Sequence, residues 1–258
     1  MRHAEADSEG AGLLKDSYID VVRRLASAQK GAARSAPAYS RFVNRKIGRL
    51  LAAAAYKAGL SPNQVTGVSA LHTFMGIVLL ILVPPSWWLG VVVMLLLVLG
   101  FAWDSADGQV ARLTGTGSPA GEWLDHIVDA IKVVTLPLAL LVALFRFEPV
   151  ESIWLLVPLI NAVTSSVMFF AMILTEQLRR AHGVTSQAAT GGRMPWLRSV
   201  MALPTDYGVL CLSFALYGAT TVFIGIYALV TLATVFFLIL ALPKWFRDVR
   251  ALAVSGQR

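Results

Sequence analysis

Residues 104–129 read DSADGQVARLTGTGSPAGEWLDHIVD and join two apolar runs of the chain. The first run, 87–103, carries no charge and leads directly into Asp104. The second run begins among acidic residues and ends at Phe145. Between the runs, two glycines and the pair Ser118-Pro119 interrupt the helical pattern, because glycine disfavours helix interiors and serine before proline favours a new helix start. The segment therefore predicts two membrane helices joined as a hairpin, with their acidic faces turned toward each other.

The rest of the chain has the apolar runs of an integral membrane protein. About 20 helical residues cross a bilayer, and the uncharged runs 63–83 and 152–175 are long enough. The uncharged run 207–243 would measure about 55 Å as one helix, so we expect two short helices with a turn at 217–219. Hydrophobic residues make up 57% of the 258 residues and charged residues 14%, against about 45–50% and about 25% in soluble domains. The predicted fold is all-α, an integral membrane protein with six transmembrane helices.

Basic residues orient the predicted helices, since Lys and Arg concentrate in short cytoplasmic loops. Of the 22 Lys and Arg, 20 fall on the side that holds both termini and the acidic segment. Both termini and the acidic segment are therefore expected to face the cytoplasm, and we expect the inner or plasma membrane of a bacterium or archaeon. The net charge of +7 is explained by attraction to anionic membrane lipids, so no nucleic-acid partner is expected.

Charge and hydrophobicity divide the chain into four predicted regions. They are a partly disordered cytoplasmic segment (1–38), an amphipathic helix in the membrane interface (39–60), the six-helix transmembrane domain (61–246) and a cytoplasmic tail (247–258). In the second region, apolar residues such as Val43 and Leu50 recur at helical spacing, and arginines such as Arg45 fall on the opposite face. The alternative interpretation is a soluble amphipathic helix packed on a partner.

Four carboxylates stand within the 26 residues of the acidic segment, those of Asp104, Asp107, Asp125 and Asp129. The i, i+3 spacing of the first two and the i, i+4 spacing of the last two put each pair on one face of its helix. Four like charges at the edge of hydrocarbon repel one another unless cations compensate them. Carboxylate ligands without cysteine suit Mg²⁺ or Mn²⁺, and two such ions can bridge a pyrophosphate. We therefore expect a pair of divalent ions.

Smaller and basic residues beside the acids fit a phosphate-containing ligand. Gly108 and Gly121 leave space for close approach, and Arg112 offers a fork of donors suited to phosphate. Two other interpretations remain open. The acids could form a solvated cytoplasmic loop, or they could form a cation-transport site, which would place carboxylates near the bilayer midplane on broken helices.

The acidic segment resembles the signature of the CDP-alcohol phosphotransferase family, D-x2-D-G-x2-A-R-x8-G-x3-D-x3-D. All eight fixed positions match with the spacing intact, and the start of the first span, Ser61-Pro62-Asn63, is also similar. The resemblance implies six transmembrane helices, a homodimer, and a site open to the cytoplasmic leaflet. It also implies an alcohol oxygen that attacks the phosphorus of a CDP-linked donor and releases CMP.

The resemblance also implies roles for individual residues. Asp104, Asp107 and Asp125 would hold the divalent ions. Asp129 would help to hold one ion and act as general base on the acceptor hydroxyl. The CDP moiety would be bound by Asp107, Gly108, Ala111, Arg112 and Gly121, with the small residues leaving room for cytidine and the arginine meeting the phosphates.

The identities of the donor and the acceptor separate two enzyme hypotheses. In the first, CDP-diacylglycerol is the lipid donor and a small polar alcohol is the acceptor. The acceptor could then be bound by basic residues, namely Lys132, Arg179, Arg180, Arg193, Arg198 and His126. The four arginines could equally be ordinary positive-inside residues. In the second hypothesis, the segment 118–126 resembles the choline and ethanolamine phosphotransferases, with diacylglycerol as acceptor and His126 and Glu122 near the head group.

Overall fold

The computed structural model describes residues 17–28, 37–147, 150–184 and 206–255. Every regular element in these ranges is helical, which confirms the all-α prediction. In chain order the elements are α2 (Tyr18–Ala28), the π-helical turn η1 (Ser40–Asn44), α3 (Arg45–Lys57), α4 (Pro62–Leu82), α5 (Trp87–Thr114), α6 (Pro119–Phe147), the 3-10 turn η2 (Ser152–Leu155), α7 (Leu156–Ala181), α9 (Tyr207–Ser213), the 3-10 turn η4 (Phe214–Leu216) and α10 (Thr220–Ser255).

Local sequence signals set where the long helices begin and end. Ser61 caps α4 in a reciprocal capping box with Gln64, and Pro62 follows as the first helical residue. Helix α5 ends at Gly115, which has a positive φ of 67° and so adopts the left-handed conformation that glycine tolerates. Helix α6 begins at Pro119, and the Ser118 hydroxyl accepts a hydrogen bond from the Gly121 amide at 3.1 Å. The predicted break between the two acidic helices is therefore confirmed.

Five of the described helical segments are long and apolar enough to cross a membrane: α4, α5, α6, η2 with α7, and α10. The segment Tyr207–Leu216 is apolar but shorter, and it stands where the fifth of the six predicted spans was expected. The turn predicted at 217–219 does separate it from α10. Helix α10 has 36 residues and continues through Pro243, so the predicted boundary between membrane domain and tail, at 246–247, falls inside one helix.

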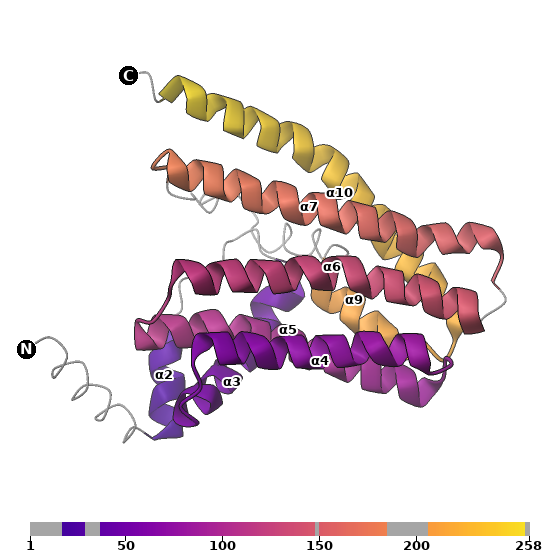
Figure 1. Cartoon of the computed structure of the whole chain (residues 1–258), viewed down its shortest axis with the longest axis horizontal. Helices are drawn as coiled ribbons and strands as arrows, with labels where there is room; N and C mark the ends of the chain where they lie inside the picture. Colours follow the sequence, from indigo (N-terminus) through magenta and orange to yellow (C-terminus); the bar gives the residue numbers. More distant parts are fainter. Residues whose placement is uncertain (1–16, 29–36, 148–149, 185–205, 256–258) are drawn as a thin grey trace, which may run out of the picture.

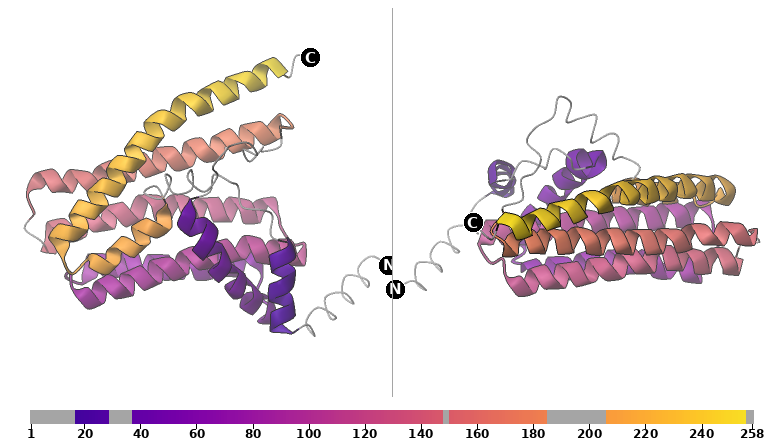
Figure 2. Two further views of the ribbon diagram at one scale, coloured as in Figure 1. Left: turned by 180° about the vertical axis from the view of Figure 1, so that it is seen from behind. Right: turned by 90° about the horizontal axis from the view of Figure 1, so that it is seen from above.

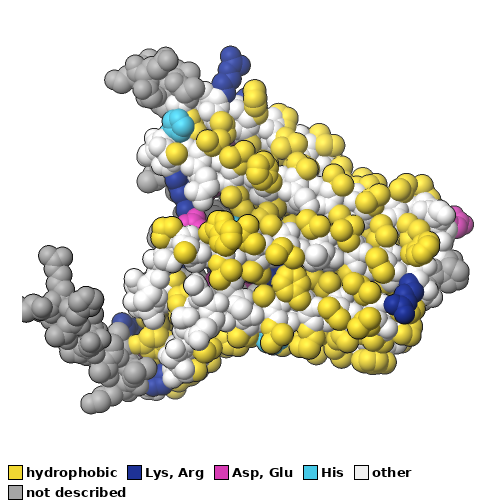
Figure 3. All heavy atoms as spheres, in the orientation of Figure 1, with side chains coloured by type: hydrophobic (Ala, Val, Ile, Leu, Met, Phe, Trp, Pro, Cys, Tyr) yellow, Lys and Arg dark blue, Asp and Glu magenta, His cyan; other side chains and the backbone are white. Residues whose placement is uncertain are grey.

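The long helices lie side by side, and their connections alternate between two ends of the bundle (Figure 1). The α5–α6 connection lies at the same end as α2, α3 and the carboxyl end of α10. From above, α2 and α3 stand to one side of the layer made by the long helices (Figure 2). Hydrophobic side chains cover the flank of this layer, and charged side chains gather toward its ends (Figure 3). This distribution is typical of a protein embedded in a bilayer.

The amino-terminal helices pack on the acidic end of α5. Residues 1–38 were predicted to form a partly disordered cytoplasmic segment, and its described part contains α2, whose Val21 side chain is buried. Asn44 donates a hydrogen bond from Nδ2 to the Phe101 carbonyl oxygen at 3.0 Å, and Gly48 lies against Ser105. Val43 of η1 and Leu50 of α3 stay 40% and 48% exposed. Helix α3 thus has one face on α5 and leaves an apolar face free, as an interfacial helix requires.

Helices α4 and α5 approach closely because Gly100 has no side chain. A Cβ at Gly100 would meet the Thr73 hydroxyl and would lie 3.2 Å from the Ser69 carbonyl oxygen. The Ser69 hydroxyl donates a hydrogen bond to the Gly100 carbonyl oxygen at 2.9 Å, which ties the two helices at this point. The contact lies one helical turn from Asp104, so helix spacing here sets the position of the acidic residues.

The substitution Gly100→Ala is expected to destabilise the protein by about 1–3 kcal/mol, because the added methyl group overpacks the α4–α5 contact. Gly67→Ala is the matched control, since a Cβ at Gly67 meets nothing within 4 Å and Ala favours helix by up to about 1 kcal/mol. Thermal unfolding in detergent, followed by tryptophan fluorescence, measures both. Equal melting temperatures for the two variants would contradict the close approach.

Candidate active site

The four aspartates lie where two long helices reach the edge of a bilayer-sized span. Helix α5 has 28 residues and α6 has 29. Counting about 20 residues from the far end of each helix reaches roughly residue 106 in α5 and residue 128 in α6. The edges defined in this way fall among Asp104, Asp107, Asp125 and Asp129. This position differs from the midplane site on broken helices that a cation transporter would require.

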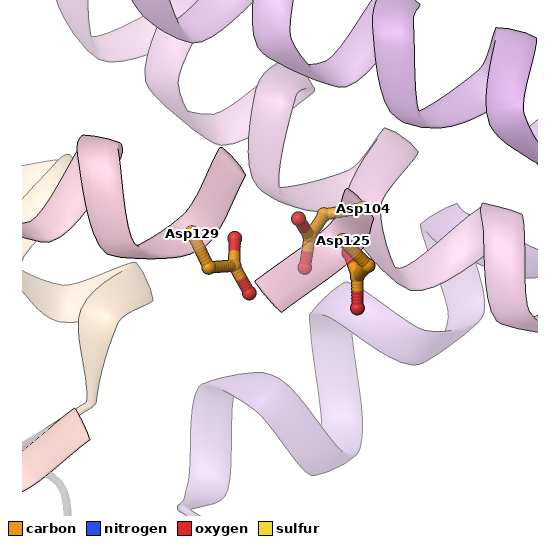
Figure 4. Close-up of side chains that lie close together, drawn as sticks. All are labelled: Asp104, Asp125 and Asp129. Atoms are coloured by element: carbon orange, nitrogen blue, oxygen red, sulfur yellow. The ribbon is translucent and has the colours of Figure 1, made fainter. Parts of the chain in front are cut away.

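Three of the four carboxylates form a tight group (Figure 4). One carboxylate oxygen each from Asp104, Asp125 and Asp129 lies within 4.8 Å of the other two. All three side chains are half-buried. The Asp125 Oδ1 atom is buried and has no hydrogen-bond partner among the described residues. A buried carboxylate oxygen without a partner is costly, so this oxygen is available to a ligand.

Asp107 lies next to this group and is held separately. The Thr66 hydroxyl donates a hydrogen bond to Asp107 Oδ2 at 2.7 Å, and the Gly108 amide donates to Asp107 Oδ1. Asp107 is only 8% exposed. Sequence reasoning placed Asp107 among the acids but did not identify Thr66 as its partner. The start of α4 could have indicated this partner, because Thr66 lies one turn beyond Pro62 on a helix that packs against α5.

A cavity of about 510 Å³ opens beside the carboxylates. It is lined by the start of α4, the end of α5 and the start of α6, including Asn63, Thr66, Asp107, Gly108, Ala111, Arg112, Gly121 and Asp125. All five residues predicted to bind the CDP moiety therefore line one cavity. The absence of a side chain at Gly121 keeps it open, because a Cβ there would lie 3.1 Å from Asn63 Oδ1.

Lys132 lies inside the carboxylate group. Its Nζ atom donates to Asp104 Oδ1 at 2.6 Å, to Asp129 Oδ1 at 3.0 Å and to the Ser69 hydroxyl oxygen at 3.1 Å. Lys132 is only 5% exposed. The sequence predicted this lysine at the acceptor subsite, whereas the structure directs all three ammonium donors to neighbouring side chains.

Most of the other predicted acceptor residues line a second cavity of about 320 Å³, between α6, α7 and α10. They are His126, Arg179 and Arg180. Arg179 pairs with Asp248 at 2.6 Å, and Arg180 pairs with Glu122 at 2.6 Å. The predicted residues Arg193 and Arg198 lie outside the described residues.

The carboxylate group has the chemistry of a magnesium or manganese site. Its donors are oxygen atoms from three aspartates, with a fourth aspartate on the adjoining cavity wall. Mg²⁺ and Mn²⁺ prefer such ligands and usually retain positions for substrate phosphates. The unpartnered Asp125 oxygen fits the same interpretation.

The fold and the site define the class of protein, namely an integral membrane protein with an aspartate group and a cavity of about 510 Å³ beside it. The sequence model of one family, described as CDP-alcohol phosphatidyltransferase, matches residues 60–244. The chain belongs to this family. A search among curated proteins gives no match. Family membership supports a phosphatidyl-transfer role and confirms the family expected from the aspartate signature.

The substitution Asp125→Asn is expected to weaken Mn²⁺ binding by at least about ten-fold, because the charge of one half-buried carboxylate is removed from the group. Glu151→Gln is the matched control, since Glu151 is an exposed acid outside the cluster, between α6 and α7. Titration of the purified protein with Mn²⁺, followed by electron paramagnetic resonance, measures both affinities. Unchanged affinity in Asp125→Asn would remove Asp125 from the metal site.

Proposed function

We propose that the chain transfers a phosphatidyl group from CDP-diacylglycerol to the hydroxyl of a small polar alcohol and releases CMP. The reaction would require Mg²⁺ or Mn²⁺, with two ions per site. The single observation that supports this most strongly is the juxtaposition of a tight aspartate group and one cavity lined by the family's small residues. Both line up at the edge of a membrane span, where a lipid donor and a soluble alcohol can meet.

The cavity residues suit a nucleotide. Gly108, Ala111 and Gly121 provide a wall without bulky side chains, against which a flat cytosine ring fits. Arg112 lies on the same wall and offers paired donors to phosphate oxygens. Asp125 belongs to the aspartate group and also lines this cavity, so the pyrophosphate of a bound CDP moiety would lie against the carboxylates.

The aspartates would bind the divalent ions and accept the proton of the acceptor. Asp104, Asp107 and Asp125, with Asp129, would hold the divalent ions, which when bound would neutralise the pyrophosphate and stabilise the leaving CMP. Asp129 lies deepest along α6 and would accept the proton of the acceptor hydroxyl as it attacks phosphorus. Lys132 bonds to one Asp129 oxygen and leaves the other oxygen for this role.

The acceptor would approach from the second cavity. His126, Arg179 and Arg180 line it, and the two guanidinium groups suit an acceptor that carries a phosphate. Arg193 belongs to the same proposal. We also propose that the site and both termini face the cytoplasm and that the protein works as a homodimer.

The first experiment measures CMP release by purified protein with Mg²⁺ or Mn²⁺. One arm supplies CDP-diacylglycerol with glycerol phosphate, inositol phosphate, inositol or serine. The other arm supplies CDP-choline or CDP-ethanolamine with diacylglycerol. Release only in the first arm supports the proposal, and the best acceptor then names the reaction. Release only in the second arm would replace it with the head-group transferase. No release in either arm, together with cation flux in vesicles, would favour the transporter.

Two conservative substitutions separate the proposed roles of the aspartates. Asp129→Asn should lower turnover by about 10²–10⁴-fold, as expected for loss of a general base, while donor binding is partly kept. Asp107→Asn should weaken donor binding and the response to metal together. CMP-release kinetics and competition by CMP measure the two effects. Full activity in either variant would contradict the assignment.

A further inference from the structure

The ammonium of Lys132 joins three helices at one point. Its three donors reach Ser69 on α4, Asp104 on α5 and Asp129 on α6. The three distances lie between 2.6 and 3.1 Å, so every donor of the ammonium is used. The side chain therefore has no free donor for a substrate in this arrangement.

The position of the ammonium is fixed by packing rather than by the carboxylates alone. Ser69 is fully buried and donates its own hydroxyl proton to the Gly100 carbonyl oxygen. Its oxygen is then free to accept from Lys132. Because Gly100 lets α4 and α5 approach closely, the Ser69 oxygen is carried to within reach of the lysine.

The charge of the site explains why a lysine is placed there. Four carboxylates would leave a large negative charge at the hydrocarbon edge before divalent ions bind. Lys132 compensates part of that charge at Asp104 and Asp129, the two members of the group that it contacts. Asp125 is the third member, and its Oδ1 atom has no hydrogen-bond partner within the described part of the chain. The ammonium thus covers one side of the group and leaves the other open.

We infer that Lys132 is a positioning residue, a built-in cation that holds Asp104 and Asp129 together while the divalent ions are absent. It binds the Oδ1 atom of each aspartate and so compensates part of their charge until divalent ions bind. The inference rests on the proposed function only in that the aspartates bind divalent ions. It replaces the expectation that Lys132 binds the acceptor.

The test compares the purified full-length protein with Lys132→Met, which keeps an unbranched apolar stem and removes the charge. Without divalent ions, the variant should melt at a lower temperature than the unchanged protein. Saturating Mn²⁺ should raise the melting temperature of the variant by more than it raises that of the unchanged protein. The variant should also bind Mn²⁺ at least about five-fold more tightly, since about five-fold is the lower end of typical couplings between two sites. Lys46→Met, at an exposed lysine on α3, is the control and should change neither quantity.

A double variant separates charge from packing. In Lys132→Met with Asp104→Asn, one repelling carboxylate is gone, so the metal-free melting temperature should recover part of the loss seen in Lys132→Met. The inference would be overturned if Lys132→Met lost the same stability with and without Mn²⁺, or if it bound Mn²⁺ with unchanged or weaker affinity. It would also be overturned if the effects of the two substitutions on the melting temperature were additive. These readouts need only metal binding, so a failure of CMP release would count against the proposed function and not against the role of Lys132.

Discussion

The constraint on which the site depends is the cost of holding several carboxylates at the edge of hydrocarbon. Like charges there repel and lose hydration, so the chain must supply or recruit positive charge. Lys132 supplies one positive charge from within the bundle. The Oδ1 atom of Asp125, which has no hydrogen-bond partner among residues 17–28, 37–147, 150–184 and 206–255, marks the side on which the compensation is incomplete. The hairpin break between α5 and α6 places this group near the ends of two long helices, beside the cavity.

Helix α4 contributes to the site without carrying a charge. Thr66, Ser69 and Thr73 recur at helical spacing on one buried stripe that faces α5. Thr66 holds Asp107, Ser69 holds Lys132, and Thr73 lies against Gly100. Small hydroxyl residues at membrane helix contacts allow close packing and satisfy polar partners at once. The spacing of the aspartates is thus set as much by α4 as by the two helices that carry them.

The features that could be predicted from the sequence are those that depend on residues close together in the chain. The aspartate spacing, the break at Ser118-Pro119 and the turn at 217–219 depend on neighbouring residues, and all three appear in the structure. The partners of Lys132 could not be predicted, because Ser69 lies 63 positions away and looks like any small residue of an apolar run. Helix α10 continues through Pro243 to Ser255, beyond the end of the uncharged run at residue 243, because a proline in a long membrane helix can be accommodated when neighbouring groups satisfy the freed backbone.

Under the proposed function, the second cavity bears on which alcohol is accepted. Arg180 lines it and pairs with Glu122, which also lines the first cavity, so one ion pair lies between the two spaces. Both side chains are about half exposed, and exposed pairs contribute only about 0–1 kcal/mol. An acceptor phosphate could therefore replace the Glu122 carboxylate on Arg180 at small cost, whereas a neutral alcohol would gain nothing from the exchange. Arg180, which pairs with Glu122 between α7 and α6, would then favour charged acceptors over neutral ones.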